Sequence, residues 1–168
     1  MTPHDDHAAV RRLPVPAAIR ELSTLARVDY ADTFLVDVGG ADGRPAEAWA
    51  RAVLEDAPLR RRSGLLSGWT ALGLRLDVGD PEAVLGWRIR RSTPDAVLLG
   101  AGGRLGLSAE LLFRREGGNL RFATFVRLDG RAARLAWAGV ERVHDPVVRS
   151  LLGEARDREM SAAGSLTP

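Results

Sequence analysis

The sequence predicts an α+β domain in which helices pack on one antiparallel sheet. Between residues 83 and 128, short apolar segments are separated by short turns, two of which contain a pair of glycines; this pattern is typical of strands joined by hairpins. Apolar residues instead recur at helical spacing in residues 45–74 and again after Gly130. Of the 168 residues, 45% are hydrophobic and 27% are charged, which is typical of a globular protein. This length fits a single domain.

The first predicted strand spans residues 30–38. Phe34, Val36 and Val38 share one face of this segment, whereas Asp37 lies on the other, as expected for a half-buried strand. A glycine-rich turn ends it.

Two short helices are expected after this strand. The first begins at Pro45, a residue suited to the first turn of a helix, and carries Trp49 and Val53 at helical spacing. The second spans about residues 59–74 and is weaker, because Gly64 and Gly68 each lower helix propensity by roughly 1 kcal/mol relative to alanine.

Four more strands are expected, which makes five in all: residues 83–91, 95–100, 104–115 and 119–128. If Gly117-Gly118 forms a two-residue hairpin turn, Phe113 lies opposite Phe122 and Leu111 lies opposite Thr124. If Gly102-Gly103 does the same, Leu98 lies opposite Leu107. Both turns then predict one apolar face, which includes Leu98, Leu111, Phe113, Phe122 and Thr124.

The opposite face is expected to be mostly polar. It carries Glu110 diagonal to Arg127, which predicts a surface ion pair that contributes only about 0–1 kcal/mol to stability. Val97, Leu112 and Phe125 form an apolar patch on this face. Such a patch can serve as an interaction surface, or it can be covered by the segment 13–28 or by the second subunit of a homodimer.

The last helix is expected to follow Gly130, with Trp137, His144 and Leu151 on its apolar stripe. Pro146 lacks a backbone N–H, and its ring clashes with the preceding turn of a helix. Asp145 can cap a new helix. The sequence therefore predicts a kink or a restart at His144-Asp145.

These elements form one domain over residues 15–155. Residues 1–14 and 156–168 have no clear apolar pattern and are expected to be disordered.

The order strand, two helices, antiparallel meander and long final helix resembles the helix-grip fold of START-like proteins, which include lipid-transfer domains, pollen allergens and polyketide cyclases (the SRPBCC superfamily). The segments Asp29–Asp32, Ala46–Arg51 and His144–Arg149 resemble parts of an uncharacterised bacterial family of such proteins. Helix-grip proteins usually have six or seven strands, so either a further strand lies near residues 72–77 or the sheet is abbreviated.

The resemblance implies a cavity between the curved sheet and the last helix that binds a hydrophobic small molecule, lipid-like or polyketide-like. Tyr30 and Thr124 are the hydroxyls expected near it. The residues expected to bind the ligand are Trp69, Trp87, Leu98, Leu111, Phe113, Phe122, Thr124, Trp137 and His144.

His144 is the one candidate for catalysis. A neutral imidazole near Asp145 can act as a general base, which would make the protein a cyclase-like or hydratase-like enzyme. Alternatively, the ring packs in the core and binds a helix carbonyl that Pro146 leaves free. His4 and His7 lie in the N-terminal segment, where no rigid scaffold would support a metal site.

Other function classes find no support in the sequence. It contains no phosphate-binding glycine loop, no G-x-S-x-G elbow and no HExxH motif, so no cofactor or metal is expected. Its 24 arginines are interspersed with 22 acidic residues, whereas nucleic-acid binders gather their cations on one face. The absence of cysteine, of a signal peptide and of a long apolar run predicts a cytoplasmic protein with no membrane span.

Overall fold

A seven-stranded antiparallel sheet forms the centre of the protein, in a computed structural model that describes residues 10–39 and 43–165. The strand order is β1-β2-β7-β6-β5-β4-β3. The strands are β1 (Val10–Leu13), β2 (Tyr30–Asp37), β3 (Ala83–Val84), β4 (Trp87–Ser92), β5 (Ala96–Gly102), β6 (Leu107–Glu116) and β7 (Asn119–Leu128).

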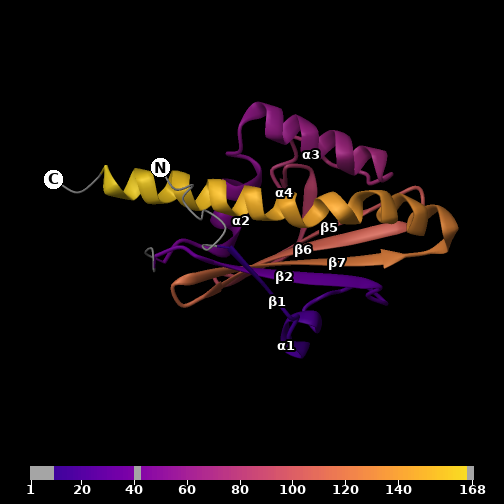
Figure 1. Cartoon of the computed structure of the whole chain (residues 1–168), viewed down its shortest axis with the longest axis horizontal. Coiled ribbons are helices and arrows are strands. Elements are labelled where there is room, and N and C mark those ends of the chain that lie inside the picture. Colours follow the sequence, from indigo (N-terminus) through magenta and orange to yellow (C-terminus); the bar gives the residue numbers. More distant parts are fainter. Residues whose placement is uncertain (1–9, 40–42, 166–168) are drawn as a thin grey trace, which may run out of the picture.

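Helices cover both faces of this sheet. They are α1 (Ala17–Arg20), α2 (Ala46–Leu54), α3 (Leu59–Ala71) and α4 (Gly130–Gly164). Figure 1 shows α3 and the long α4 on one side of the sheet and the short α1 on the other. This arrangement confirms the predicted α+β helix-grip architecture.

The sheet has two strands more than the five expected. One is β1, which pairs with β2 and lies in a segment expected to be disordered, so that expectation is wrong for residues 10–13. The other arises because residues 83–91 form two strands. Leu85 and Gly86 have φ angles of 46° and 88°, in the left-handed region that turns the chain. The remaining N-terminal residues, 1–9, lie outside the described residues.

The C-terminal boundary is also corrected. Disorder was expected from residue 156, but α4 continues to Gly164. Arg156 and Arg158 hold this extension by donating hydrogen bonds to the backbone carbonyls of Asp37 and Ala52, each at 2.8 Å. Arginines make these contacts, so no apolar pattern reveals them in the sequence.

The predicted register is confirmed for one hairpin and wrong for the other. In the β6–β7 hairpin, Phe113 lies opposite Phe122, as predicted. In the β5–β6 hairpin, Leu98 lies opposite Leu112 rather than Leu107. The observed partner, Leu112, lies an odd number of residues from the predicted one, Leu107. Because side chains alternate between the faces of a sheet, Leu98 lies on the opposite face from the one predicted.

The loop between β5 and β6 explains this error. Gly102 pairs with Ser108, so the loop is longer than two residues, and Gly103 forms an isolated bridge with Leu74. Val97, predicted on the outer face, therefore packs in the main core on the inner face.

The outer face of the sheet carries a small second core. Leu98, Leu112 and Phe125 are buried there against Ile19 of α1. The sequence allowed either the segment 13–28 or a second subunit to cover this patch. In the structure, the N-terminal segment covers it. Figure 1 shows α1 beneath this face.

Helix α3 is only weakly anchored to the inner face. Leu65, at 9% exposure, is the one buried residue among its 13 residues. Trp69 adds an edge contact to the buried Trp87, with ring centroids 5.3 Å apart. Apart from Leu65, the apolar contacts of this helix come from the partly buried Leu66 and Trp69.

Helix α4 runs without a break through Pro146, so the predicted restart at His144-Asp145 is wrong. The missing N–H removes one backbone hydrogen bond, but buried residues on both sides, including Trp137 and Val148, hold the helix on the core. No helix in the described ranges 10–39 and 43–165 combines the length and the apolar character that a membrane span requires.

Candidate functional site

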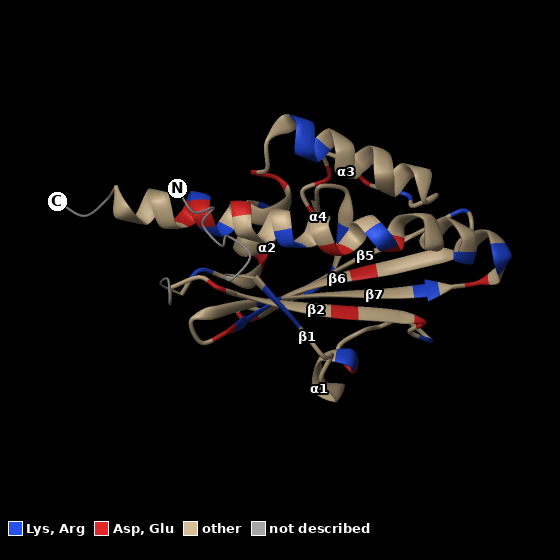
Figure 2. Cartoon of the chain, viewed as in Figure 1, with Lys and Arg blue, Asp and Glu red and all other residues tan. Residues whose placement is uncertain are grey.

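A buried carboxylate marks the inner face of the sheet. Asp32 is the third residue of β2 and lies opposite Thr124 of β7, and its side chain is fully buried. Acidic residues are visible in mid-strand on β2 and β6 in Figure 2. A buried charge is costly unless it is paired, so the partners of Asp32 define the site.

His144 of α4 is the principal partner of Asp32. Its Nε2 lies 2.9 Å from Asp32 Oδ2 and 3.3 Å from Thr124 Oγ1. The side chain of His144 is 14% exposed. The ring is therefore neither sealed in apolar packing nor bonded to a helix carbonyl, which corrects that alternative.

The contacts of Nε2 determine which ring nitrogen is free. When Asp32 is ionised it only accepts hydrogen bonds, so Nε2 is then the ring nitrogen that carries the shared proton. In the neutral form of the ring, Nδ1 of His144 would then carry the lone pair. This is the arrangement in which a carboxylate orients an imidazole for acid–base work.

Tyr30 is the second donor to Asp32. Its hydroxyl donates to Asp32 Oδ2 at 2.8 Å, and its ring packs against Trp137, with centroids 4.8 Å apart. Burial and the neighbouring Asp32 carboxylate raise the pKa of Tyr30 well above its usual value. The hydroxyl therefore stays protonated and donates to Asp32.

Two groups in this cluster have no hydrogen-bond partner among the described residues. They are Asp32 Oδ1 and Trp137 Nε1, and both atoms are buried. The ring of Trp137 lies 5.4 Å from that of His144, centroid to centroid. Buried polar atoms are rarely left unpaired, so the cluster has an unused acceptor and an unused donor.

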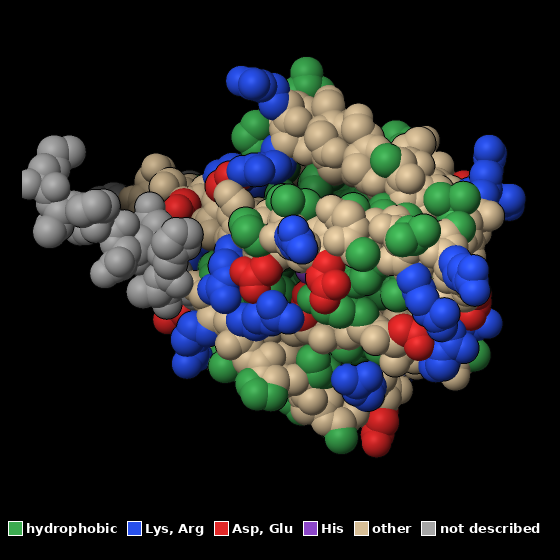
Figure 3. Space-filling model, turned by 45° about the vertical axis from the view of Figure 1, so that its right-hand side comes forward, with side chains coloured by type: hydrophobic (Ala, Val, Ile, Leu, Met, Phe, Trp, Pro, Cys, Tyr) green, Lys and Arg blue, Asp and Glu red, His purple; other side chains and the backbone are tan. Residues whose placement is uncertain are grey.

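A hydrogen-bonded chain connects Asp32 to the surface. Arg12 of β1 donates to the Tyr30 hydroxyl at 3.4 Å and to Asp145 Oδ2 at 3.0 Å. Asp145 also accepts from Arg149 Nε at 2.5 Å. Figure 3 shows acidic and basic side chains next to one another on the surface of the molecule.

Asp145 and Arg149 also attach the edge strand to α4. Arg149 Nη1 donates to the backbone carbonyl of Val10 at 3.0 Å. Burial favours the neutral form of Asp145, but the hydrogen bonds and charges of Arg149 and Arg12 lower its pKa. Two of the three sequence segments quoted above, Asp29–Asp32 and His144–Arg149, therefore meet in space.

A small cavity opens beside His144 between the sheet, α3 and α4, with a volume of about 50 Å³. Its other lining residues are apolar and come from α2, α3, β6, β7 and α4. They include Leu65, Trp69, Leu111, Phe122 and Val147. His144 is the one polar side chain in the lining.

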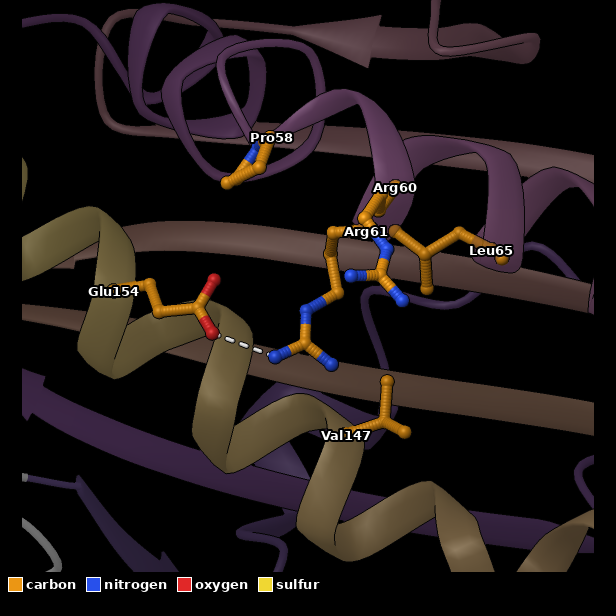
Figure 4. Close-up of a pocket in the computed structure, with 7 residues that line it drawn as sticks. Pro58, Arg60, Arg61, Leu65, Val147 and Glu154 are labelled. Atoms are coloured by element: carbon orange, nitrogen blue, oxygen red, sulfur yellow. Dashed lines mark hydrogen bonds and ion pairs between the residues drawn. The ribbon is translucent and has the colours of Figure 1, made fainter.

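A larger groove of about 570 Å³ lies between α3 and α4. Leu65 and Val147 line both the groove and the small cavity. Figure 4 shows these two side chains facing the gap, Leu65 from α3 and Val147 from α4. The groove and the cavity therefore meet at this pair.

The structure brings together most, but not all, of the predicted ligand-binding residues. Trp69, Leu111, Phe122 and His144 line the cavity, and Thr124 contacts His144. Trp137 packs beside that ring. Trp87 and Phe113 lie in the second layer, each with its ring against a lining residue.

Leu98 is the predicted site residue that the structure excludes. It belongs to the small core on the outer face of the sheet because of the register error described above.

Sequence reasoning missed Asp32 as a functional residue. A signal was present: Asp32 has the same parity as Phe34 and Val36, which puts it on the apolar face of the strand. An acidic residue on a buried face indicates a partner elsewhere in the chain.

Glu110 was also misjudged, because it is buried and forms no ion pair with Arg127. Its carboxylate accepts hydrogen bonds from Ser23 Oγ at 2.6 Å and from the Thr24 N–H at 3.1 and 3.2 Å, and also from the Thr24 hydroxyl. Arg127 instead pairs with Asp129 at 2.9 Å. Glu110 thus fastens the N-terminal segment to the outer face.

No group of three or more potential metal ligands occurs in the part of the chain that the structure describes. His4 and His7 lie outside the described residues. Comparisons with protein-family models, with curated proteins and with solved structures found no significant match.

Proposed function

We propose that this protein binds a hydrophobic small molecule, lipid-like or polyketide-like, between the sheet and α4. The observation that carries the proposal is the apolar cavity with a single polar side chain, His144, held in place by Asp32. Ligand sites combine a mostly apolar lining with a few fixed polar groups. The proposed likeness to START-like proteins rests on the helix-grip topology and agrees with this function.

The ligand requires α3 to move. The cavity of about 50 Å³ is well below the roughly 300–1,000 Å³ of typical ligand sites, but the groove above it reaches about 570 Å³. Displacing Leu65, the one buried residue of α3, would join the two spaces. Helix α3 then acts as the lid of the site.

Native mass spectrometry and thermal shift with uncharged probes test this proposal. The probes are straight-chain alcohols of 8 to 16 carbons and neutral polycyclic aromatic ketones. We expect at least one class to add mass at a 1:1 ratio and to raise Tm, because a ligand that binds only the folded state stabilises it. A protein that shows neither effect with any probe would overturn the proposal.

A substitution in the groove tests the location. Gly64 lines the groove, and an added Cβ would meet no atom within 4 Å. Gly64→Trp should therefore fill the groove without disturbing the fold and should abolish the thermal shift. Ser67→Trp is the matched control, because Ser67 is an exposed residue of the same helix that lines no cavity described above. It should keep the wild-type response.

A second function is favoured by one specific observation, the Asp32–His144 pair. In this reading the protein is an acid–base enzyme of the cyclase or hydratase kind. Nδ1 of His144 removes a proton from a carbon next to a ketone, the C–H electron pair forms the enolate, and the same nitrogen later returns the proton. No covalent bond to the protein is needed.

Deuterium exchange tests this second function. A long-chain β-ketoester is incubated in D₂O with the protein, and deuterium at the acidic carbon is measured by mass spectrometry. Exchange above the buffer rate should fall about 10²- to 10⁴-fold in His144→Ala. If the wild-type protein and His144→Ala exchange the probe at the same rate, His144 is not a catalytic base.

A further inference from the structure

The groove between α3 and α4 has a charged wall next to its apolar one. Its lining includes Arg60 and Arg61 together with Pro58, Leu65 and Val147. Figure 4 shows both guanidinium groups reaching from α3 toward α4. The side chain of Arg60 forms no hydrogen bond or ion pair with any described residue, whereas Arg61 uses Nη2 alone, toward Ser150 and Glu154.

These arginines do not stabilise the helix that carries them. They lie in the first turn of α3, which contains no acidic residue. Cations are unfavourable at this end of a helix, because the peptide dipoles leave partial positive charge there. The position of Arg60 and Arg61 is therefore explained better by what faces them across the groove.

Glu154 shows what the groove accepts. Its carboxylate lies 2.6 Å from Arg61 Nη2 and reaches across from α4. Figure 4 shows this contact spanning the gap. A carboxylate from another molecule can take the same position, or it can bind Arg60 and the unused edge of Arg61. Arginine forms strong paired hydrogen bonds with carboxylates.

We propose that the ligand is an anionic amphiphile, an apolar chain that ends in a carboxylate. The carboxylate binds Arg60 and Arg61 at the groove, and the chain passes between Leu65 and Val147 into the cavity beside Trp69. This inference rests on the proposed function and deepens it, because it specifies the head group and the direction in which the ligand lies.

Two probes of equal chain length test the head group. Binding of dodecanoate and of 1-dodecanol is measured by isothermal titration calorimetry below the micelle-forming concentration of the acid. The wild-type protein should bind dodecanoate on the order of tenfold more tightly than 1-dodecanol, because the carboxylate forms a charge-assisted hydrogen bond that the alcohol lacks. The variant Arg60→Met/Arg61→Met should lose this preference and keep its affinity for the alcohol.

Two further variants control for net charge and for the competing carboxylate. Arg20→Met/Arg91→Met removes the same charge at exposed arginines outside the groove and should bind both probes as the wild type does. Glu154→Gln frees Arg61 and should strengthen dodecanoate binding severalfold while leaving the alcohol unchanged.

The outcomes separate this inference from the proposed function. Equal affinity for the two probes, or an equal loss of both in Arg60→Met/Arg61→Met, would overturn the head-group assignment and leave the apolar site standing. Binding of neither probe would overturn the assignment and also count against the proposed function. Circular dichroism melting of each variant establishes that it is folded.

Discussion

Two buried carboxylates lie on opposite faces of the same sheet, and their partners differ. Glu110, on the outer face, accepts hydrogen bonds at both oxygens from Ser23 and Thr24. Asp32, on the inner face, uses Oδ2 for two donors and leaves the buried Oδ1 unpaired among the described residues. A fully satisfied carboxylate holds a fold together, whereas an incompletely satisfied one next to a titratable ring indicates a place for chemistry or for a ligand.

Glu110→Gln should produce the largest loss of stability. Both oxygens of Glu110 accept from donors, so the NH₂ group of glutamine must face another donor. We expect about 2–3 kcal/mol of destabilisation and a Tm lower by several degrees, measured by urea and thermal unfolding. A free energy of unfolding within about 0.5 kcal/mol of the wild type would contradict the claim that Glu110 stabilises the fold.

His144→Ala should cost less, about 1–2 kcal/mol. The variant leaves Asp32 with the Tyr30 hydroxyl as its single described donor. Thermal unfolding measures the loss, and His144→Gln is the control, because its amide can still donate to Asp32. An unchanged Tm in His144→Ala would mean that the Asp32–His144 contact contributes nothing to the fold.

Asp32→Asn should cost least of the three, about 1 kcal/mol or less. The amide oxygen can still accept hydrogen bonds from Tyr30 and His144. The NH₂ group takes the place of Oδ1, which accepts no hydrogen bond from any described residue. The fold should survive, whereas the deuterium exchange proposed for His144 should be lost. If Asp32→Asn lowered the free energy of unfolding more than Glu110→Gln does in the same urea titration, Asp32 would be the more important of the two carboxylates for stability.

An exposed carboxylate extends the comparison to pH. Hydrogen bonds from Arg27 and from the backbone N–H of Leu128 lower the pKa of Asp29 from 3.8 to about 2. Because the folded-state pKa is depressed, the stabilisation is present above pH 4 and is lost as the pH falls toward 2. The slope of stability against pH in this window should be shallower in Asp29→Asn. Equal slopes in the wild type and in Asp29→Asn would show that Asp29 does not cause the loss of stability at low pH.

The sequence predicts the elements of this fold better than the way in which they meet. The β6–β7 register follows from one glycine pair, because a two-residue turn fixes the opposing residues. The same reasoning fails at Gly102-Gly103, where the loop is longer and Gly103 pairs with Leu74. The length of a glycine-containing loop depends on such tertiary contacts, and these are not local in sequence.

The candidate site was only half predictable for a similar reason. His144 and Thr124 follow from the parity and the spacing of apolar residues. Asp32 and Arg12 do not, because their importance comes from contacts that join β1, β2 and α4. Local patterns identify which face a residue is on, but they do not identify its polar partner across the core.

The pairing of β2 with β7 has a consequence for the order of folding. Strands β3 to β7 are joined by short connections, so they can form soon after they emerge from the ribosome. Strand β2 must wait for β7, because Tyr30 pairs with Val126 and Asp37 with Asn119, and closing such a long loop is slow. Helix α4 follows β7 in the chain, so His144 becomes available to Asp32 only after all the strands of the sheet have been synthesised. The pair therefore cannot form before residue 144 has been synthesised, which is long after Asp32.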